Sequence, residues 1–462
     1  PVVFYDNCIL FLLYSNILKN HFIVVLLKGL WYGGSIMEEK DYKDLLSCLN
    51  EEQFTKFINS LNDDPIKGAC YNPKNISFEI VKENIFGALN EEYGFLSYPF
   101  GTLVGNDPLY FGGAFYPLDH SSFAVSRNLS LFLKDKNDLK ILDLCAAPGG
   151  KSIALSSLIK PSILVCNDIS FKRAEVLKLN VERSGIENVV VTSQDPHAFL
   201  KDFEGYFDCV ILDAPCSGSG MTRKKEKMED DWSWEKVEKL VPIQKYLIEL
   251  AYKLVKKNGL ISYSTCSYAK QEDEQIVCYL MENHEVELLN IPDDGSLKGI
   301  EGIGRRYIPG LYKGEGQYQC ILKKLGDSKE NDFQPIEYKR TIKGFDNFYA
   351  VKYKGIDRLF SNMDKRFLSL NPLKIGYAVD DLTPYAKCPY DWDLCHANGI
   401  FESLDLNLDN AKKYIRGEDL LLSTDIFEDK IIVASYKKMP LGFLKGKKGR
   451  FRNYLPKGLR IH

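Results

Sequence analysis

The chain has 462 residues, of which 45% are hydrophobic and 27% charged, and these values are ordinary for a globular protein of two or three domains. Its formal net charge is only −3, which excludes a protein that coats nucleic acid by bulk charge but leaves room for a local basic face. The 12 cysteines are scattered without the dense spacing of a disulfide framework, so we expect reduced thiols and a cytoplasmic protein.

The first 36 residues are apolar but interrupted. Cys8–Leu18 and Phe22–Leu27 are apolar, and Lys19, Asn20 and His21 separate them. They contain no unbroken run of about 20 apolar residues, the length that a membrane-spanning helix needs. Because Met37 opens a polar, helix-like stretch, we interpret residues 1–36 as an upstream extension outside the natural fold, with a signal or anchor segment as the alternative.

Residues 37–110 are predicted to form short helices and loops. Leu45, Leu49 and Phe54 recur at helical spacing, and Asn62–Pro65 breaks the pattern. We expect an N-terminal helical region that covers the next domain.

Strand and helix patterns alternate within residues 111–325, most clearly from residue 139 onward. This order predicts an α/β fold with a doubly wound, mostly parallel sheet, in which ligands bind beyond the carboxyl ends of the strands. The predicted strands are Lys140–Leu144, Ile163–Cys166, Val189–Val191, Phe207–Leu212 and Gly259–Tyr263, and the predicted helices are Lys151–Ile159, Phe171–Ser184, Trp234–Lys256 and Glu272–Asn283.

A polar linker near residues 326–332 leads to a tail domain, 333–462. Its last segment, Lys437–His462, holds nine Lys or Arg and no Asp or Glu. Cys388 and Cys395 lack the second pair that a structural zinc site requires, so no metal is expected.

The first chemical motif, residues 143–151, follows a predicted strand and opens a helix. Gly149 and Gly150 allow a ligand close to the backbone, and the helix start offers free N–H groups. The motif is neither GxGxxG nor a phosphate-binding loop, so a nucleotide-like ligand of another kind fits it. The candidate ligand-binding residues of this segment are Cys145, Ala146, Ala147, Pro148, Gly149, Gly150 and Lys151.

Two acidic residues follow the next two strands. Asp168 stands where nucleoside-binding sheets place a ribose ligand, and the alternative is a cap for the helix at Phe171. Asp195 is a candidate partner for an adenine amino group, or a cap ahead of Pro196.

Asp213-Ala-Pro-Cys216-Ser-Gly218 and Ser264-Thr-Cys266-Ser267 follow the last two strands of the series. Both strand ends face one crevice, so Asp213, Cys216 and Cys266 are expected to converge. A single buried Cys is usually an inert small hydrophobe, but two cysteines beside a carboxylate indicate chemistry.

The strings AAPGGK at 146–151, DAPCSG at 213–218 and STCS at 264–267 resemble the Sun-type RNA cytosine-5 methyltransferases, over about residues 110–325. Gly314-Glu-Gly316, after Arg306, resembles the end of that catalytic domain.

Asn453–Arg460 resembles the tail of the RsmF-type ribosomal RNA methyltransferases, which carry a PUA-like RNA-binding domain. Tyr116–Ser122 departs from the family's aromatic-Gln-acidic-Pro-Ser run, which bears on local substrate contacts.

The resemblance implies a Rossmann-like methyltransferase sheet that binds S-adenosylmethionine through residues 145–151, Asp168, Asp195 and Asp213. It assigns the nucleophile to Cys266 and product release to Cys216. Addition of a thiolate to carbon 6 of cytosine activates carbon 5, and Asp213 is expected to hold ring nitrogen 3. DNA methyltransferases place their nucleophile on the Pro-Cys motif, so the presence of both cysteines favours RNA.

The expected partner is RNA, best matched by 16S ribosomal RNA or a ribosomal subunit, with large-subunit or transfer RNA as alternatives. No membrane and no obligate protein partner are implied. The basic segment Lys437–Arg460, with Phe443, Phe451 and Tyr454 interleaved, is expected to grip phosphates unless it is a solvated tail, and Arg223-Lys-Lys225 is a second candidate contact. The N-terminal region, 37–110, is a further candidate for RNA binding.

Two other classes remain open. A Rossmann oxidoreductase is disfavoured by the missing GxGxxG and by the paired cysteines. A non-catalytic ribosome-assembly factor is disfavoured because Lys151, Asp213, Cys216 and Cys266 are all present.

Overall fold

The computed structural model describes residues 37–221, 223, 232–336, 348–361, 363–379, 391–397, 400–422 and 429–461. The interpretation of residues 1–36 lies outside this range, as do Cys388, Lys224 and Lys225. Within it, every helix is too short or too polar to cross a membrane.

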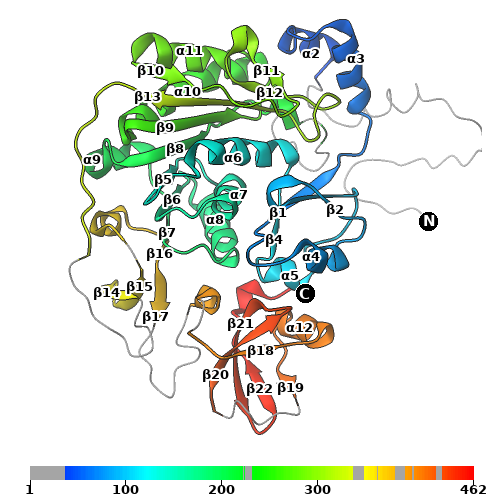
Figure 1. Cartoon of the computed structure of the whole chain (residues 1–462), viewed down its shortest axis with the longest axis vertical. Coiled ribbons are helices and arrows are strands. Elements are labelled where there is room, and N and C mark those ends of the chain that lie inside the picture. The colour runs from blue at the N-terminus through cyan, green and yellow to red at the C-terminus, as the bar shows by residue number, and fades with distance from the viewer. Residues whose placement is uncertain are drawn as a thin grey trace, which may run out of the picture.

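A ten-stranded sheet forms the centre of the molecule, in the order β11-β12-β13-β9-β8-β5-β6-β7-β16, with β10 paired to β13 (Figure 1). The strands from β9 to β7 run parallel, and β16 and the strands beyond β9 are antiparallel. The bounds are β5 Lys140–Asp143, β6 Ile163–Asn167, β7 Val189–Thr192, β8 Phe207–Asp213, β9 Val255–Thr265, β10 Val286–Leu288, β11 Leu297–Lys298, β12 Arg305–Tyr307, β13 Gln317–Lys324 and β16 Lys374–Ile375. The predicted doubly wound sheet is therefore confirmed, and its strand order reverses between β5 and β8.

Helices cover both faces of this sheet because the parallel strands are apolar on both sides. Along β8, Val210 and Leu212 face one hydrophobic cluster, and Cys209 and Ile211 face another. The first cluster includes side chains of α10 and α11, and the second includes side chains of α6, α7 and α8. The bounds are α6 His120–Leu133, α7 Gly150–Leu158, α8 Phe171–Arg183, α9 Leu200–Phe203, α10 Trp234–Leu254 and α11 Glu274–Asn283.

The region 37–110 was expected to be helices and loops, and it also contains strands. The helices α2 (Glu39–Leu45), α3 (Glu51–Ser60) and α4 (Phe78–Asn84) are present, but a four-stranded antiparallel sheet, β2-β3-β1-β4, stands among them. Its strands are β1 Lys67–Tyr71, β2 Leu89–Asn90, β3 Phe95–Tyr98 and β4 Phe115–Pro117, with α5 at Pro108–Phe111. The strands are short and separated by turns, so their alternation is too brief to identify from sequence.

The tail is not one unit that begins at residue 333. Phe367 stacks on Phe203 of α9 with ring centroids 4.5 Å apart, and β16 extends the central sheet at β7. A three-stranded sheet joins them, made of β14 Tyr349–Tyr353, β15 Ile356–Phe360 and β17 Tyr377–Val379. The segment around residues 348–379 therefore packs on the catalytic sheet.

The C-terminal domain is a five-stranded sheet, β18-β20-β21-β22-β19, with one helix (Figure 1). It packs against the N-terminal sheet through one continuous hydrophobic cluster, in which Phe111 meets Trp392 at 5.5 Å. The two ends of the chain therefore support each other beside the catalytic domain. The bounds are β18 Ser403–Asp405, α12 Leu408–Ile415, β19 Leu420–Leu421, β20 Ile431–Tyr436, β21 Met439–Lys447 and β22 Arg450–Asn453.

Candidate active site

The loop between β5 and α7 is shaped by glycine and held by α8. Gly149 has a φ of 108°, which side chains other than that of glycine rarely allow. Arg173 and Asn180 of α8 donate hydrogen bonds to the carbonyl oxygens of Ala147 at 2.7 Å and Pro148 at 2.8 Å. The first N–H groups of α7 have no intrahelical partner, as at any helix start, and are available to a polar ligand.

Asp168, at the end of β6, has an acceptor oxygen suited to a ligand hydroxyl. The residue is 2% exposed, and its Oδ1 accepts a hydrogen bond from the Ser170 N–H at 2.9 Å. Its Oδ2 lies 3.3 Å from Nη1 of Arg173 but accepts no hydrogen bond from the residues that the structure describes. A buried acceptor in this condition is costly unless a ligand completes it.

Asp195 is exposed and caps a short 3-10 helix, because its Oδ1 accepts the His197 N–H at 2.9 Å. The structure thus supplies the capping role that the sequence left open. The second carboxylate oxygen of Asp195 receives no hydrogen bond that would compete with a ligand from the described residues.

Asn167 ties the ends of three strands together, and the sequence did not single it out. Its amide group donates to the carbonyl oxygens of Leu144 at 3.3 Å and Gln194 at 3.0 Å. Its side-chain oxygen accepts from Thr192 Oγ1 at 2.7 Å and from the Gln194 N–H at 3.0 Å. An Asn in a fully buried strand position is the signal that could have identified it.

The two predicted cysteines meet. Sγ of Cys216 lies 3.1 Å from Sγ of Cys266, in hydrogen-bonding contact. This hydrogen bond, followed by burial, raises the pKa of the Cys216 thiol well above its usual value. Cys216 is therefore held as a thiol that can donate its proton toward Cys266.

Lys151 and Asp213 form an ion pair beside these sulfurs, with Nζ of Lys151 2.7 Å from Oδ2 of Asp213. Burial acts to lower the pKa of Lys151, but attraction to Asp213 and to Cys266 outweighs it, so the pKa is raised. Oδ1 of Asp213 accepts a hydrogen bond from Ser264 Oγ at 2.8 Å. The sequence predicted the convergence of Asp213 with the cysteines, but it did not pair Asp213 with Lys151.

Glu272 braces the two cysteine loops from beneath. It is fully buried, and its Oε2 accepts hydrogen bonds from Ser217 Oγ at 2.5 Å and Ser267 Oγ at 2.6 Å. Its Oε1 accepts from the Ser217 N–H at 2.9 Å and from Nε2 of Gln244 at 3.0 Å. Since Ser217 follows Cys216 and Ser267 follows Cys266, this carboxyl group sets the relative position of the two sulfurs. In the sequence, Glu272 is visible only as the first residue of a predicted helix.

The turn at Gly314–Gly316 packs directly on the Cys216 loop. The Gly316 N–H donates to the Gly220 carbonyl oxygen at 2.8 Å, and the Gly220 N–H donates to the Cys266 carbonyl oxygen at 2.9 Å. A Cβ on Gly316 would lie 2.4 Å from the Gly220 Cα, so glycine is required there. Close backbone packing explains the resemblance noted at this turn.

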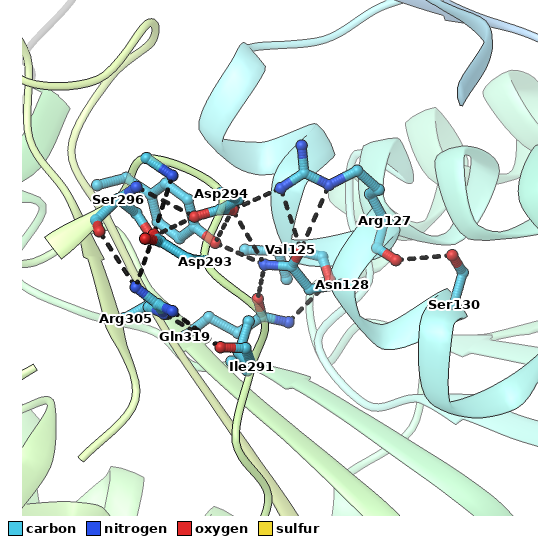
Figure 2. Close-up of polar contacts among 12 residues, drawn as sticks. Val125, Arg127, Asn128, Ser130, Ile291, Asp293, Asp294, Ser296, Arg305 and Gln319 are labelled. Atoms are coloured by element: carbon cyan, nitrogen blue, oxygen red, sulfur yellow. Dashed lines mark hydrogen bonds and ion pairs between the residues drawn. The ribbon is translucent and has the colours of Figure 1, made fainter. Parts of the chain in front are cut away.

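Helix α6 is anchored to the sheet edge by a polar network (Figure 2). Nη2 of Arg127 lies 2.5 Å from Oδ2 of Asp294, and the Asn128 amide donates to the Tyr307 hydroxyl at 2.7 Å and to Gln319 Oε1 at 3.1 Å. The N-terminal cap of the same helix, Asp119, accepts the Glu315 N–H at 3.1 Å. The network thus fixes α6 and, through it, the turn that supports the cysteines.

The predicted phosphate contact at Arg223 is wrong. Its Nη2 donates to the Gly314 carbonyl oxygen at 2.6 Å, and its Nε lies 3.3 Å from Oε2 of Glu315. The guanidinium therefore braces the glycine turn from inside the protein.

The aromatic part of the predicted basic tail is also corrected. Phe443 is 2% exposed and Phe451 1% exposed, so both belong to the core of the C-terminal domain. Of the three aromatic residues, Tyr454 is the one left partly exposed, and Arg452 lies 5.6 Å from its ring centroid.

The described residues include no group of three or more His, Cys, Asp or Glu side chains that could hold a metal ion. Cys395 is buried, and its sequence neighbour Cys388 lies outside the described part of the chain.

The comparisons with known proteins agree with this geometry. The family model described as 16S rRNA methyltransferase RsmB/F matches residues 130–323, and the model described as methyltransferase RsmF PUA domain matches residues 401–461. The chain belongs to the RsmB/F methyltransferase family. Both domain matches fall on units that fold separately in the structure.

Several curated relatives carry the name Ribosomal RNA small subunit methyltransferase F. The protein of Shewanella piezotolerans is 26% identical over 386 residues, which cover 77% of this chain and 81% of its own. That of Shewanella oneidensis is 28% identical over 394 residues, which cover 79% and 82%. That of Vibrio vulnificus is 34% identical over 235 residues, about half of each chain (50% and 49%).

Solved structures show the same fold. A methyltransferase homolog protein from Pyrococcus horikoshii aligns with a TM-score of 0.52 at 23% identity, over 66% of this chain and 100% of that one. NSun6 from the same organism, solved with SFG, aligns with a TM-score of 0.54 at 19% identity, over 63% and 98%.

S-adenosylmethionine is the cofactor of this methyltransferase, and the residues at the switch point of its sheet fit that molecule. The Oδ2 atom of Asp168 suits a ribose hydroxyl, and the Gly149 turn leaves room for a ligand against the backbone. The tail that was expected to be PUA-like is matched from residue 401 rather than from 333.

Proposed function

We propose that this enzyme methylates carbon 5 of a cytosine in small-subunit ribosomal RNA, with Cys266 as the covalent nucleophile. The observation that carries the proposal is the 3.1 Å contact between the Cys216 and Cys266 sulfurs beside the Lys151–Asp213 pair. The names of the relatives support the choice of RNA.

Cofactor binding is assigned to residues 145–151, Asp168, Asp195 and the neighbourhood of Asp213. The start of α7 and the Asp168 oxygen hold the nucleoside part, and Asp195 uses its second oxygen toward the adenine amino group. S-adenosylmethionine supplies the electrophilic methyl group that carbon 5 receives.

The two cysteines have different tasks because their protons differ. Cys216 keeps its proton and donates toward Cys266, and the positive charge of Lys151 attracts a negative sulfur. Cys266 therefore acts as the thiolate that forms a bond to carbon 6 of the cytosine. Once carbon 5 carries the methyl group, loss of its remaining proton breaks the bond between carbon 6 and Cys266, and Cys216 assists this release.

The Lys151–Asp213 pair balances the charge of the addition step. As the sulfur bonds to carbon 6, electron density moves to ring nitrogen 3, which takes up a proton. Asp213 passes on the proton that Lys151 holds at 2.7 Å, and the proton returns along the same path on elimination. Ser264 fixes the carboxylate for this transfer at 2.8 Å.

The target base must leave its stack, which costs a few kcal/mol and less in a loop. The basic hairpin of β21 and β22 and the partly exposed Tyr454 are the surfaces assigned to RNA in the C-terminal domain. A ribosomal subunit in the cytoplasm is the proposed partner, with large-subunit or transfer RNA as the alternative.

The test is incubation of labelled S-adenosylmethionine with small-subunit RNA and with assembled small subunits. Wild type should produce 5-methylcytosine, Cys266→Ala should produce none, and Cys216→Ala should accumulate a covalent protein–RNA adduct. Cys278→Ala, on α11 away from the crevice, is the matched control and should retain full activity.

An adduct trapped by Cys266→Ala instead would reverse the two cysteine roles. Binding of RNA without any methyl transfer by wild type would replace this proposal with a ribosome-assembly role.

A further inference from the structure

The largest cavity of the described residues lies away from the cysteines, at the junction of three units. It has a volume of about 540 Å³ and is lined by the N-terminal sheet, the carboxyl ends of α7 and α8, and the turn between β20 and β21. This volume is in the range of ligand sites, which are often found between domains. Nothing in the proposed chemistry uses this cavity.

The charged groups of its lining are mostly positive. They are Lys74, Lys160, Lys438 and Glu187, a formal sum of +2 in a chain whose net charge is −3. Glu187 lies 3.0 Å from Nζ of Lys160, whereas no acidic side chain of the described residues pairs with Lys74 or Lys438. The carboxyl ends of α7 and α8 add partial negative charge of about half a unit each, which leaves an excess of positive charge.

The turn that carries Lys438 indicates a use for its charge. Lys437 and Lys438 form a two-residue turn between β20 and β21, with φ values of 49° and 67°. Glycine and asparagine occupy such turns at lower cost than lysine does. Lys437 pairs with Glu83 of α4, while Lys438 faces the cavity.

The floor of the cavity offers an unused hydrogen-bonding group. Nε2 of His396 is buried and has no hydrogen-bond partner among the described residues. Burial and then Lys374 lower the pKa of His396 to about 4, so the ring is neutral at pH 7. A neutral imidazole nitrogen can bond to a base or to a ribose hydroxyl.

The cavity is near enough to the catalytic crevice for one RNA strand to reach both. Helix α7 starts at the cofactor loop and ends at the cavity, and its nine residues span about 13 Å. A strand that crosses this distance would contact the catalytic, N-terminal and C-terminal units together.

We propose that this cavity binds one nucleotide of the substrate RNA, its phosphate held by Lys74, Lys160 and Lys438 and its base or ribose by His396. The proposal rests on RNA as the substrate in the proposed function. A free nucleotide has the same chemistry, so the experiment separates the two sources.

The experiment measures the binding of a labelled single-stranded RNA of about 12 nucleotides by fluorescence anisotropy at several salt concentrations. The double variant Lys74→Ala/Lys438→Ala should bind at least tenfold more weakly. Its salt slope should fall by about 1.4, from about 0.7 for each lost phosphate contact. The control Lys412→Ala/Lys413→Ala, on the exposed face of α12, removes the same charge elsewhere in the C-terminal domain and should bind like wild type.

A second variant, Ser157→Phe, fills the cavity without a change of charge and should weaken RNA binding while the salt slope stays the same. Unchanged RNA affinity and slope in the double lysine variant would overturn the proposal. So would saturable binding of free CMP that these lysines control while RNA binding is unaffected. Because binding is read without methyl transfer, a failure of the proposed catalysis leaves this result independent.

Discussion

Glu272 offers the sharpest test of how the fold positions the reacting groups. Its carboxyl group accepts four hydrogen bonds in a site from which water is excluded, and three of them come from the serines that follow the two cysteines. We predict that Glu272→Gln and Glu272→Ala slow methyl transfer by displacing the two sulfurs relative to each other.

The magnitude follows from the hydrogen bonds. Each contributes about 1 kcal/mol net, so Glu272→Ala should lose about 4 kcal/mol of unfolding free energy. Glu272→Gln can keep its carbonyl oxygen toward the Ser217 N–H and Gln244, so its loss should be about 1–2 kcal/mol. A displacement of 1 Å at the reacting atoms can cost about 100-fold in rate, so we expect a loss of roughly 10-fold for Gln and 100-fold or more for Ala.

The assay is single-turnover methyl transfer at saturating RNA, together with urea unfolding of the same preparations. The KM for S-adenosylmethionine should stay unchanged, because Glu272 touches the cysteine loops rather than the loop at 145–151. Asp364→Asn is the matched control. Asp364 is also fully buried and accepts hydrogen bonds from Gln334 and Arg366, but it lies on the segment packed against α9.

A rate loss in Asp364→Asn equal to that in Glu272→Gln at the same loss of stability would refute the reasoning. It would show that general destabilisation, rather than the position of the cysteines, lowers the rate. Wild-type rates in Glu272→Gln would refute it equally.

Three further predictions concern stability and packing. Burial raises the pKa of Asp143 to about 7, so its protonated form is the one that the fold favours. Its contribution is fully present below pH 4 and is lost as pH rises through 7, on the order of 4 kcal/mol, and Asp143→Asn should flatten urea-unfolding stability between pH 4 and 8. Asp294 has the opposite sign: burial opposes ionisation, but hydrogen bonds from Ser296 and the charge of Arg127 outweigh it and lower its pKa. Its stabilising effect is present above the unfolded pKa and is lost as pH falls, so Asp294→Ala should cost about 1–3 kcal/mol at pH 7 and much less near pH 2; an equal cost at both values would contradict this. Gly316→Ala should abolish methyl transfer while S-adenosylmethionine still binds, as calorimetry can measure, because the new Cβ would meet Gly220 at 2.4 Å.

The sequence predicted most of the central sheet because the relevant signals are local. The strands β5, β6, β7 and β8 begin at the predicted residues, and α8 starts at Phe171 as expected. Apolar runs between turn residues identify buried parallel strands, and residues that follow such strands converge at one edge. The order of residues alone is therefore enough to name Asp168, Asp213, Cys216 and Cys266 as candidates.

Long-range packing decided what the sequence left open or mistook. Arg223 looks like a free phosphate contact until Glu315 and the Gly314 carbonyl oxygen, some ninety residues away, come to enclose it. Phe443 and Phe451 stand among lysines and arginines in sequence, yet the alternation of β21 and β22 turns both rings into a core.

The sequence by itself therefore determined the type of sheet, the cofactor loop and the identity of the two reactive thiols. Only the tertiary structure decided that Glu272 joins their loops, that β16 completes the sheet at β7, and that the N-terminal and C-terminal units share one core. The physical reason is that periodicity and turn chemistry are properties of neighbouring residues. Burial and hydrogen-bond partnership, in contrast, depend on which distant segments fold against one another.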